Sequence, residues 1–206
     1  MPNTEDQRPD LLAQIQARHC NTLALLAAAI DLGHIAAARL NADEAARIVG
    51  FKHITALRSQ TNDLVYRYAR SLCSPVEGHL IDCIRERNGH PAVFLLDGLP
   101  LRLKKADAQG RTSNYPTRAV RAMGAVSFRY SLFAEQDDLD IAIEEGLVVD
   151  LVYFSGEAAG QYNGVGLKLA GGGVDCIAID IPTDDVLVRI SPEVHETYHA
   201  LRADIA

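Results

Sequence analysis

The stretch AAARLNADEAARIVGFKHITALRSQTNDLVYRYAR, from Ala36 to Arg70, contains two helix-type patterns that meet at Gly50. Before the glycine, Asn41 is a suitable helix N-cap and is followed by small and apolar residues. After it, residues recur at spacings of three and four, the stripe of a core-facing helix. These residues are Ile54, Leu57, Thr61, Leu64, Val65, Tyr68 and Leu72. A short helix, a glycine turn and a longer helix form the layout of a helix-turn-helix, which plain helical bundles share.

The residues on either side extend this helical region. Asp10–Gly33 is predicted to form a helix that Gly33 ends, and Pro75 is predicted to end the long helix. A further helix is predicted over Val76–Arg87, with Leu80, Cys83 and Ile84 facing inward. Residues 1–88 are therefore expected to form a helical dimerisation and DNA-regulatory domain.

After Asn88-Gly89 the periodicity changes from helical to strand-like. Asp97-Gly98 predicts a hairpin between Ala92–Leu96 and Leu99–Leu103, in which Pro100 implies an edge strand or a late start. The remaining expected elements are a loop over Lys104–Arg118, strands over Ala125–Phe133 and Leu147–Phe154, a short helix over Leu139–Glu145, a hairpin of Tyr162–Leu169 with Val174–Ile181, and a final helix from Ser191-Pro192.

These elements together predict an α+β fold. An N-terminal helical bundle with a helix-turn-helix-like pair is followed by a mainly antiparallel β domain with a C-terminal helix. The second domain, residues 89–206, has no role that the sequence identifies.

The segment from about Asn21 to Arg70 resembles the D subunit of the flagellar master transcriptional activator, the FlhD family. The similarity lies in an early helix, Asn21–Ile30, in the small-residue helix Asn41–Val49, and in Thr61-Asn62-Asp63-Leu64-Val65 with Arg67 just after. It covers about a quarter of the chain and requires a shorter connection near Gly33 than the family usually has. The resemblance implies a dimeric regulator subunit that relies on a C-type partner subunit for much of its DNA contact.

A homodimer is also predicted from the residues themselves. Several helices within Asp10–Leu72 carry apolar surface, and a segment of this size is small for a self-sufficient core. The expected dimerisation residues are Leu23, Leu26, Ile30, Leu57, Leu64 and Val65.

Charge is distributed unevenly along the chain. Residues 1–90 are neutral overall, residues 91–135 carry +4 and residues 136–206 carry −11. We call the basic segment within residues 91–135 the basic arm and residues 136–206 the acidic lobe. The basic arm could contact phosphates, or its charges could protect an edge strand from aggregation. It could also pair with the acidic lobe of a second copy. The expected DNA contacts are Lys52, Arg58 and Arg67 on the helices and Arg102, Lys104, Lys105, Arg111 and Arg118 on the arm.

His195-Glu196-Thr197-Tyr198-His199 matches the HExxH motif, in which two histidines bind zinc and the glutamate activates a water. Only seven residues follow His199, which leaves little room for the usual downstream third ligand and argues against a zinc site. A third ligand could come from upstream, where Asp184 and Asp185 are the nearest candidates. Glu193 also places a charge where such helices usually keep a neutral residue. The alternative, which we favour from sequence alone, is an amphipathic helix that docks through Val194, Tyr198 and Leu201 and exposes both histidines. No cofactor is then expected.

Other residues give weaker signals. Cys73, His79, Cys83 and His90 fit no usual zinc spacing, and the four cysteines are expected to be free thiols. The N-terminus does not resemble a signal peptide, and no apolar run long enough for a bilayer is evident, so a cytoplasmic location is expected.

Three functions remain open on the sequence. The leading hypothesis is a transcriptional regulator, or regulator subunit, that acts as a dimer with a DNA-binding partner. The alternatives are a zinc-dependent hydrolase using HETYH and a protein-binding module, such as an antitoxin or phage-defence component, acting through the acidic lobe.

Overall fold

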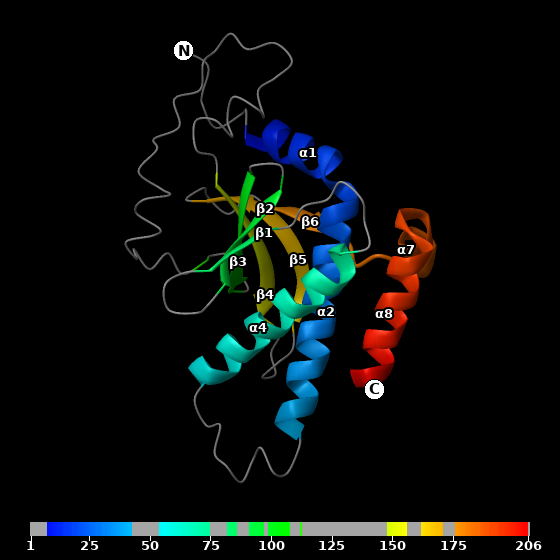
Figure 1. Ribbon diagram of the computed structural model, residues 1–206. Helices are drawn as coiled ribbons and strands as arrows, with labels where there is room; N and C mark the ends of the chain where they lie inside the picture. Colours follow the sequence, from blue (N-terminus) through cyan, green and yellow to red (C-terminus); the bar gives the residue numbers. More distant parts are fainter. Residues whose placement is uncertain are drawn as a thin grey trace, which may run out of the picture.

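A helical layer packs on one face of a six-stranded mixed sheet in the computed structural model (Figure 1). The structure describes residues 8–42, 54–74, 82–85, 91–96, 99–107, 112, 148–155, 162–170 and 176–205. The order of elements confirms the predicted α+β class, with helices first, strands next and a helix at the C-terminal side. In Figure 1, α2 and α4 cross in front of the sheet, and α8 lies beside α2.

The helices are α1 (Arg8–Arg18), α2 (Cys20–Ala42), α4 (Ile54–Cys73), α7 (Asp184–Ile190) and α8 (Pro192–Ile205). The prediction of one helix ending at Gly33 is wrong, because the break falls at His19 and α2 continues nine residues past the glycine. Backbone hydrogen bonds run through the break, from the His19 N–H to the Ile15 carbonyl (3.0 Å) and from the Leu23 N–H to the His19 carbonyl (2.8 Å).

Gly33 serves the packing of α2 against α4 instead of ending a helix. A Cβ placed on Gly33 would lie 2.5 Å from Val65 Cγ2, 3.1 Å from the Val65 backbone nitrogen and 3.3 Å from its Cα. Only a residue without a side chain permits this approach, so the two helices meet backbone to backbone at this point. The close contact explains why a glycine is tolerated in the middle of a helix, where it costs about 1 kcal/mol relative to alanine.

Because α2 does not stop at Gly33, it forms an apolar helix that the sequence analysis did not anticipate. Residues 20–40 are long and apolar enough, by length and composition, to cross a membrane. Most of this stretch is buried in the fold, where Leu25, Leu26 and Ile30 belong to the core. Its apolar character is thus accounted for by packing against the sheet, α4 and α8.

The strands follow one another across the sheet in sequence order. They are β1 (Asp82–Arg85), β2 (Pro91–Leu96), β3 (Leu99–Ala106), β4 (Val149–Ser155), β5 (Tyr162–Leu169) and β6 (Ile177–Ile179). Neighbouring pairs are antiparallel except β3 with β4, which are parallel from Leu101 opposite Val149 to Ala106 opposite Phe154. The mainly antiparallel prediction therefore holds apart from one central parallel pair.

Both predicted hairpins form. Leu96 pairs with Leu99 across the first turn, and Pro100 precedes the pairing of β3 with β4, so the strand starts late on that side. β5 and β6 form the second hairpin, although β6 is shorter than predicted.

Two predictions of local structure are wrong. Residues 82–85 form a strand, not part of a helix, because they pair with β2. Lys104 and Lys105 belong to β3, not to a loop, since they pair with Val152 and Tyr153 of β4.

Several other predicted elements lie outside the described residues. These are residues 43–49 of the predicted helix Asn41–Val49 with the turn at Gly50, the strand Ala125–Phe133 and the helix Leu139–Glu145. The predicted N-cap at Asn41 is wrong, because Asn41 lies within α2. The helix-turn-helix and the division into domains at residue 88 therefore remain predictions.

One sheet face forms the core with the helices. Phe94, Leu101, Leu151 and Leu167 are fully buried on this face, and they belong to the same hydrophobic cluster as Leu26 of α2. Aromatic contacts join the two layers, with the Tyr66 and Phe94 ring centroids 4.4 Å apart and those of His34 and Tyr153 4.8 Å apart. Helices and strands therefore share one core.

The opposite sheet face carries a row of buried charges. Arg102, Asp150 and Lys168 lie side by side on β3, β4 and β5, and all three are buried. The Arg102 guanidinium donates two hydrogen bonds to the Asp150 carboxylate, Nε to Oδ1 at 2.6 Å and Nη2 to Oδ2 at 2.9 Å. Arg102 lies in a strand as predicted, but its expected role as a phosphate contact does not fit this burial, because its charge is paired with Asp150 inside the sheet.

We expect Gly33→Ala to lower the free energy of unfolding by about 1–3 kcal/mol, because overpacking against Val65 outweighs the better helix propensity of alanine. Chemical denaturation measures the change. The double variant Gly33→Ala/Val65→Ala supplies the control, since it should lose less than the sum of the two single variants. Strict additivity would show that the two positions do not touch.

We expect Asp150→Ala to lower the free energy of unfolding by about 3–5 kcal/mol, because it leaves the Arg102 charge buried without its carboxylate. Urea titration followed by circular dichroism measures the loss, and Asp180→Ala at an exposed acid is the matched control. The double variant Arg102→Met/Asp150→Leu should recover most of the lost free energy of unfolding, because it removes both buried charges. A loss below about 1 kcal/mol in Asp150→Ala, the value of an exposed pair, would contradict the buried ion pair.

Candidate metal centre

Helices α7 and α8 form a tight hairpin around Ser191. The Ser191 backbone N–H donates to the Leu187 carbonyl at 3.0 Å and ends α7. The Ser191 hydroxyl accepts a hydrogen bond from the Glu193 N–H at 3.2 Å, and Pro192 is the first residue of α8. The predicted N-cap and first-turn proline are confirmed.

The hairpin docks on the helical layer as an amphipathic unit. Val194, Tyr198 and Ile205 of α8 are buried, Leu201 is partly buried against the core, and both α2 and α4 contact α8. Arg39 Nη1 of α2 also donates a hydrogen bond to the Ile205 carbonyl. The docking predicted for Val194, Tyr198 and Leu201 is therefore confirmed, and it fixes the direction in which the histidines of α8 point.

Tyr198 links the docked face of α8 to the histidines. Its hydroxyl accepts a hydrogen bond from Arg202 Nη1 at 3.1 Å, and its ring meets the His199 ring edge-on with centroids 5.6 Å apart. Burial, followed by the Asp31 charge on α2, raises the pKa of the Tyr198 phenol. Both effects favour the protonated, neutral form of the phenol.

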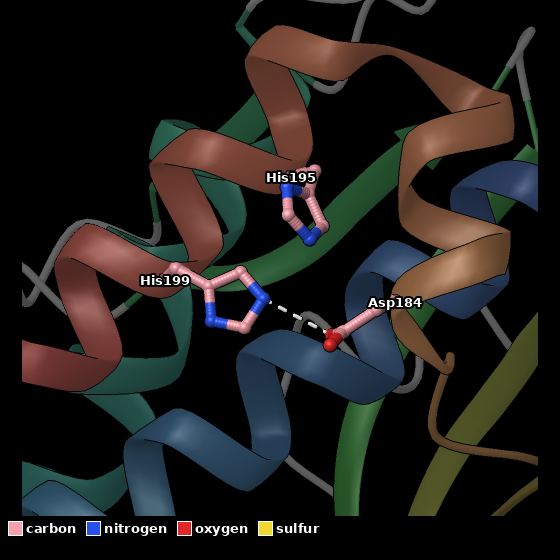
Figure 2. A group of neighbouring side chains, drawn as sticks. All are labelled: Asp184, His195 and His199. Atoms are coloured by element: carbon pink, nitrogen blue, oxygen red, sulfur yellow. Dashed lines mark hydrogen bonds and ion pairs between the residues drawn. The ribbon is translucent and has the colours of Figure 1, made fainter.

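His195 and His199 lie one turn apart on α8, and Asp184 reaches them from the first turn of α7. Asp184 Oδ1 and His199 Nε2 are 3.0 Å apart, and the two imidazole centroids are 4.4 Å apart (Figure 2). One ligand atom from each of the three residues lies within 4.8 Å of the other two. Of the two upstream acids considered as a third ligand, Asp184 is the one that lies beside both histidines.

The spacing suits a transition-metal ion. With bonds of about 2.0–2.2 Å to nitrogen and oxygen, tetrahedral ligand atoms lie roughly 3.3–3.6 Å apart. The Asp184–His199 pair is already near this separation, and the widest separation in the group exceeds it by less than about 1.5 Å. Small rotations of side chains at the surface are enough to close that difference.

The cluster is open to solvent. The side chains of His199 and Asp184 are 44% and 66% exposed, and His195 is half-buried. Glu196 is exposed and does not belong to the group of three. By the 100° step of an α-helix, Glu196 points almost directly away from the buried side of α8. A metal at this cluster would keep a coordination position facing solvent.

The expected dimerisation residues lie largely inside the single chain. Leu23, Leu26, Ile30 and Val65 are buried, and Leu64 is partly buried against the same core. The apolar surface that motivated a dimer through α2 and α4 is thus used within the chain at these positions. The Leu57 side chain lies outside the described residues.

The expected DNA contacts are not brought together by the described part of the chain. Arg67 is exposed on α4. On β3, Lys105 is exposed and Lys104 is half-buried. Lys52, the Arg58 side chain, Arg111 and Arg118 lie outside the described residues. Of the possible Cys/His cluster, Cys73 is buried, and the side chains of His79, Cys83 and His90 are likewise not described.

Helix α7 was not predicted, although the sequence carries signals for it. Thr183 stands at its N-cap position and Asp184 and Asp185 occupy its first turn, where acidic residues are favoured. The pattern was obscured because α7 has only seven residues.

Comparison of the chain with protein-family models, with curated proteins and with solved structures gives no match. The resemblance to the FlhD family remains a prediction.

Proposed function

We propose that this protein binds a divalent transition metal, with zinc as the best fit, through Asp184, His195 and His199. The convergence of ligand atoms from two separate helices is the observation that supports this proposal. Two histidines one turn apart occur on many surface helices. A carboxylate from another element, hydrogen-bonded to the second imidazole at 3.0 Å, is a more specific arrangement.

The donor set favours zinc over the hard cations. Imidazole nitrogen suits zinc, copper, iron and nickel, whereas magnesium and calcium prefer all-oxygen ligands. Three protein ligands with an open position are typical of catalytic or exchangeable zinc, while structural sites usually have four protein ligands. Hydrolysis would additionally require Glu196 to reach the metal-bound water, and Glu196 stands apart from the cluster. We therefore propose metal binding without assigning a hydrolytic reaction.

We expect wild type to bind one zinc ion per chain, and His199→Ala and Asp184→Asn to weaken the affinity at least ~10-fold, because each removes a charged or nitrogen ligand. Isothermal titration calorimetry of metal-free protein measures this. Asp185→Asn is the matched control, since Asp185 is an exposed acid in the same turn and outside the cluster. Equal affinity in Asp184→Asn and Asp185→Asn would refute the site, as would the absence of zinc binding by wild type.

A role in transcription is a second candidate. Arg67 and Arg70 are both exposed on α4, one turn apart and therefore on one side of that helix. Paired cations on a helix are suited to contact successive phosphates. With the resemblance of this segment to the FlhD family, this arrangement supports DNA contact through α4, within a complex that contains a partner subunit.

If α4 contacts DNA, Arg67→Ala/Arg70→Ala should weaken binding for all sequences and reduce the slope of log affinity against log salt by about 0.9 per lost phosphate contact. Fluorescence anisotropy over a salt series measures both quantities. Arg189→Ala removes an exposed arginine from the acidic hairpin and should leave the slope unchanged. Identical slopes in wild type and the double variant would exclude α4 from the DNA.

A further inference from the structure

Exposed apolar side chains adjoin the metal centre. Among the described residues, the large hydrophobics that are exposed are Leu40, Ile181 and Val188. Ile181 lies three residues before Asp184 and Val188 lies four residues after it. Because residues four apart share a side of a helix, Val188 and Asp184 lie on the same side of α7. Val188 therefore lies beside the candidate metal ligand Asp184 on α7, and Ile181 lies just before the start of this helix.

Charge on the hairpin is both plentiful and mixed. Residues 180–205 contain six acidic and two basic residues, a net charge of −4. Arg202 is hydrogen-bonded to the Tyr198 hydroxyl, whereas Arg189 is exposed next to Val188. An exposed arginine among exposed acids such as Asp185 and Glu193 is complementary to a second copy of the same surface.

The open coordination position of the proposed metal centre and the Glu196 carboxylate are also complementary between two copies. The three ligands leave a coordination position that faces solvent, and the Glu196 carboxylate faces solvent one residue from His195. Each copy of the chain thus carries an incomplete coordination sphere and a carboxylate outside its own cluster. In a twofold symmetric dimer the same surface of each chain contacts the other chain. Glu196 of each copy can then fill the open coordination position of the other copy.

We propose that two copies of this chain associate through the α7–α8 hairpin when zinc is bound, and that Glu196 of the second copy supplies the fourth ligand to each metal. The proposal rests on zinc binding at Asp184, His195 and His199. Ile181 and Val188 pack at this contact, and Arg189 faces the acids of the other copy.

The association requires the metal because of the charge on the hairpin. Two metal-free hairpins bring together two net charges of −4, which repel each other over roughly a Debye length of 8–10 Å. One divalent ion per chain halves the net charge of each hairpin, and the shared carboxylate then links the chains directly. Zinc therefore acts as a switch between monomer and dimer.

Sedimentation velocity with zinc and with EDTA tests the proposal. The protein concentration is fixed at about 50 μM, where association with a micromolar dissociation constant is detectable. Wild type should sediment as a dimer in zinc and as a monomer in EDTA. Glu196→Ala should stay monomeric in zinc while it still binds the metal in calorimetry with no more than a few-fold loss. Val188→Asp should likewise stay monomeric in zinc while it still binds the metal. Asp204→Ala, at an exposed acid near the other end of α8, should dimerise like wild type.

Each alternative outcome identifies which step is wrong. Zinc-loaded wild type that remains a monomer would overturn the association and leave the metal centre intact. Dimers that persist equally in EDTA, or in Glu196→Ala with zinc, would overturn the role of the shared carboxylate. A wild type that takes up no zinc would overturn both the metal centre and the inference built on it.

Discussion

The backbone contact between Gly33 and Val65 sets the geometry on which the rest of the helical layer depends. It allows α2 and α4 to approach closely enough that both cover the same sheet face. Asn62 of α4 can then accept a hydrogen bond from the Tyr153 hydroxyl of β4 at 3.5 Å, and Tyr66 stacks against Phe94 of β2. The position of α2 in turn provides the surface on which α8 docks, and α8 carries both histidines of the candidate metal centre.

The charged row on the other sheet face contains a residue, Arg102, that the sequence pattern predicts to be exposed and that the fold buries. Arg102 lies in a basic stretch, and sequence clustering alone suggests a solvent-exposed arm. Its carboxylate partner, Asp150, lies 48 residues away and becomes a neighbour only when β3 and β4 pair in parallel. Charge counts along the chain cannot detect such a pair, because they contain no information about which strands are adjacent.

Local patterns predicted well the elements whose boundaries are written in a few residues. Asp97-Gly98 identified the first hairpin, and Ser191-Pro192 identified the start of α8. Elements decided by distant partners were missed: residues 82–85 look helical until they pair with β2, and Gly33 looks like a helix end until Val65 is placed against it. The candidate metal centre was partly predictable. HETYH supplied two of the three candidate ligands and Asp184 stood among the nearest acids, but the choice between Asp184 and Asp185 depended on α7.

The burial of α2 has a consequence for how the protein is made. Its apolar helix precedes the start of α8, which covers part of it, by about 150 residues. At ribosomal rates of roughly 5–20 residues per second, at least ~8 s separate the synthesis of the two helices. During that interval a nascent chain presents a helix that, by length and composition, is suitable for a bilayer. Until the C-terminal hairpin has been synthesised, α2 therefore lacks the part of its cover that α8 supplies.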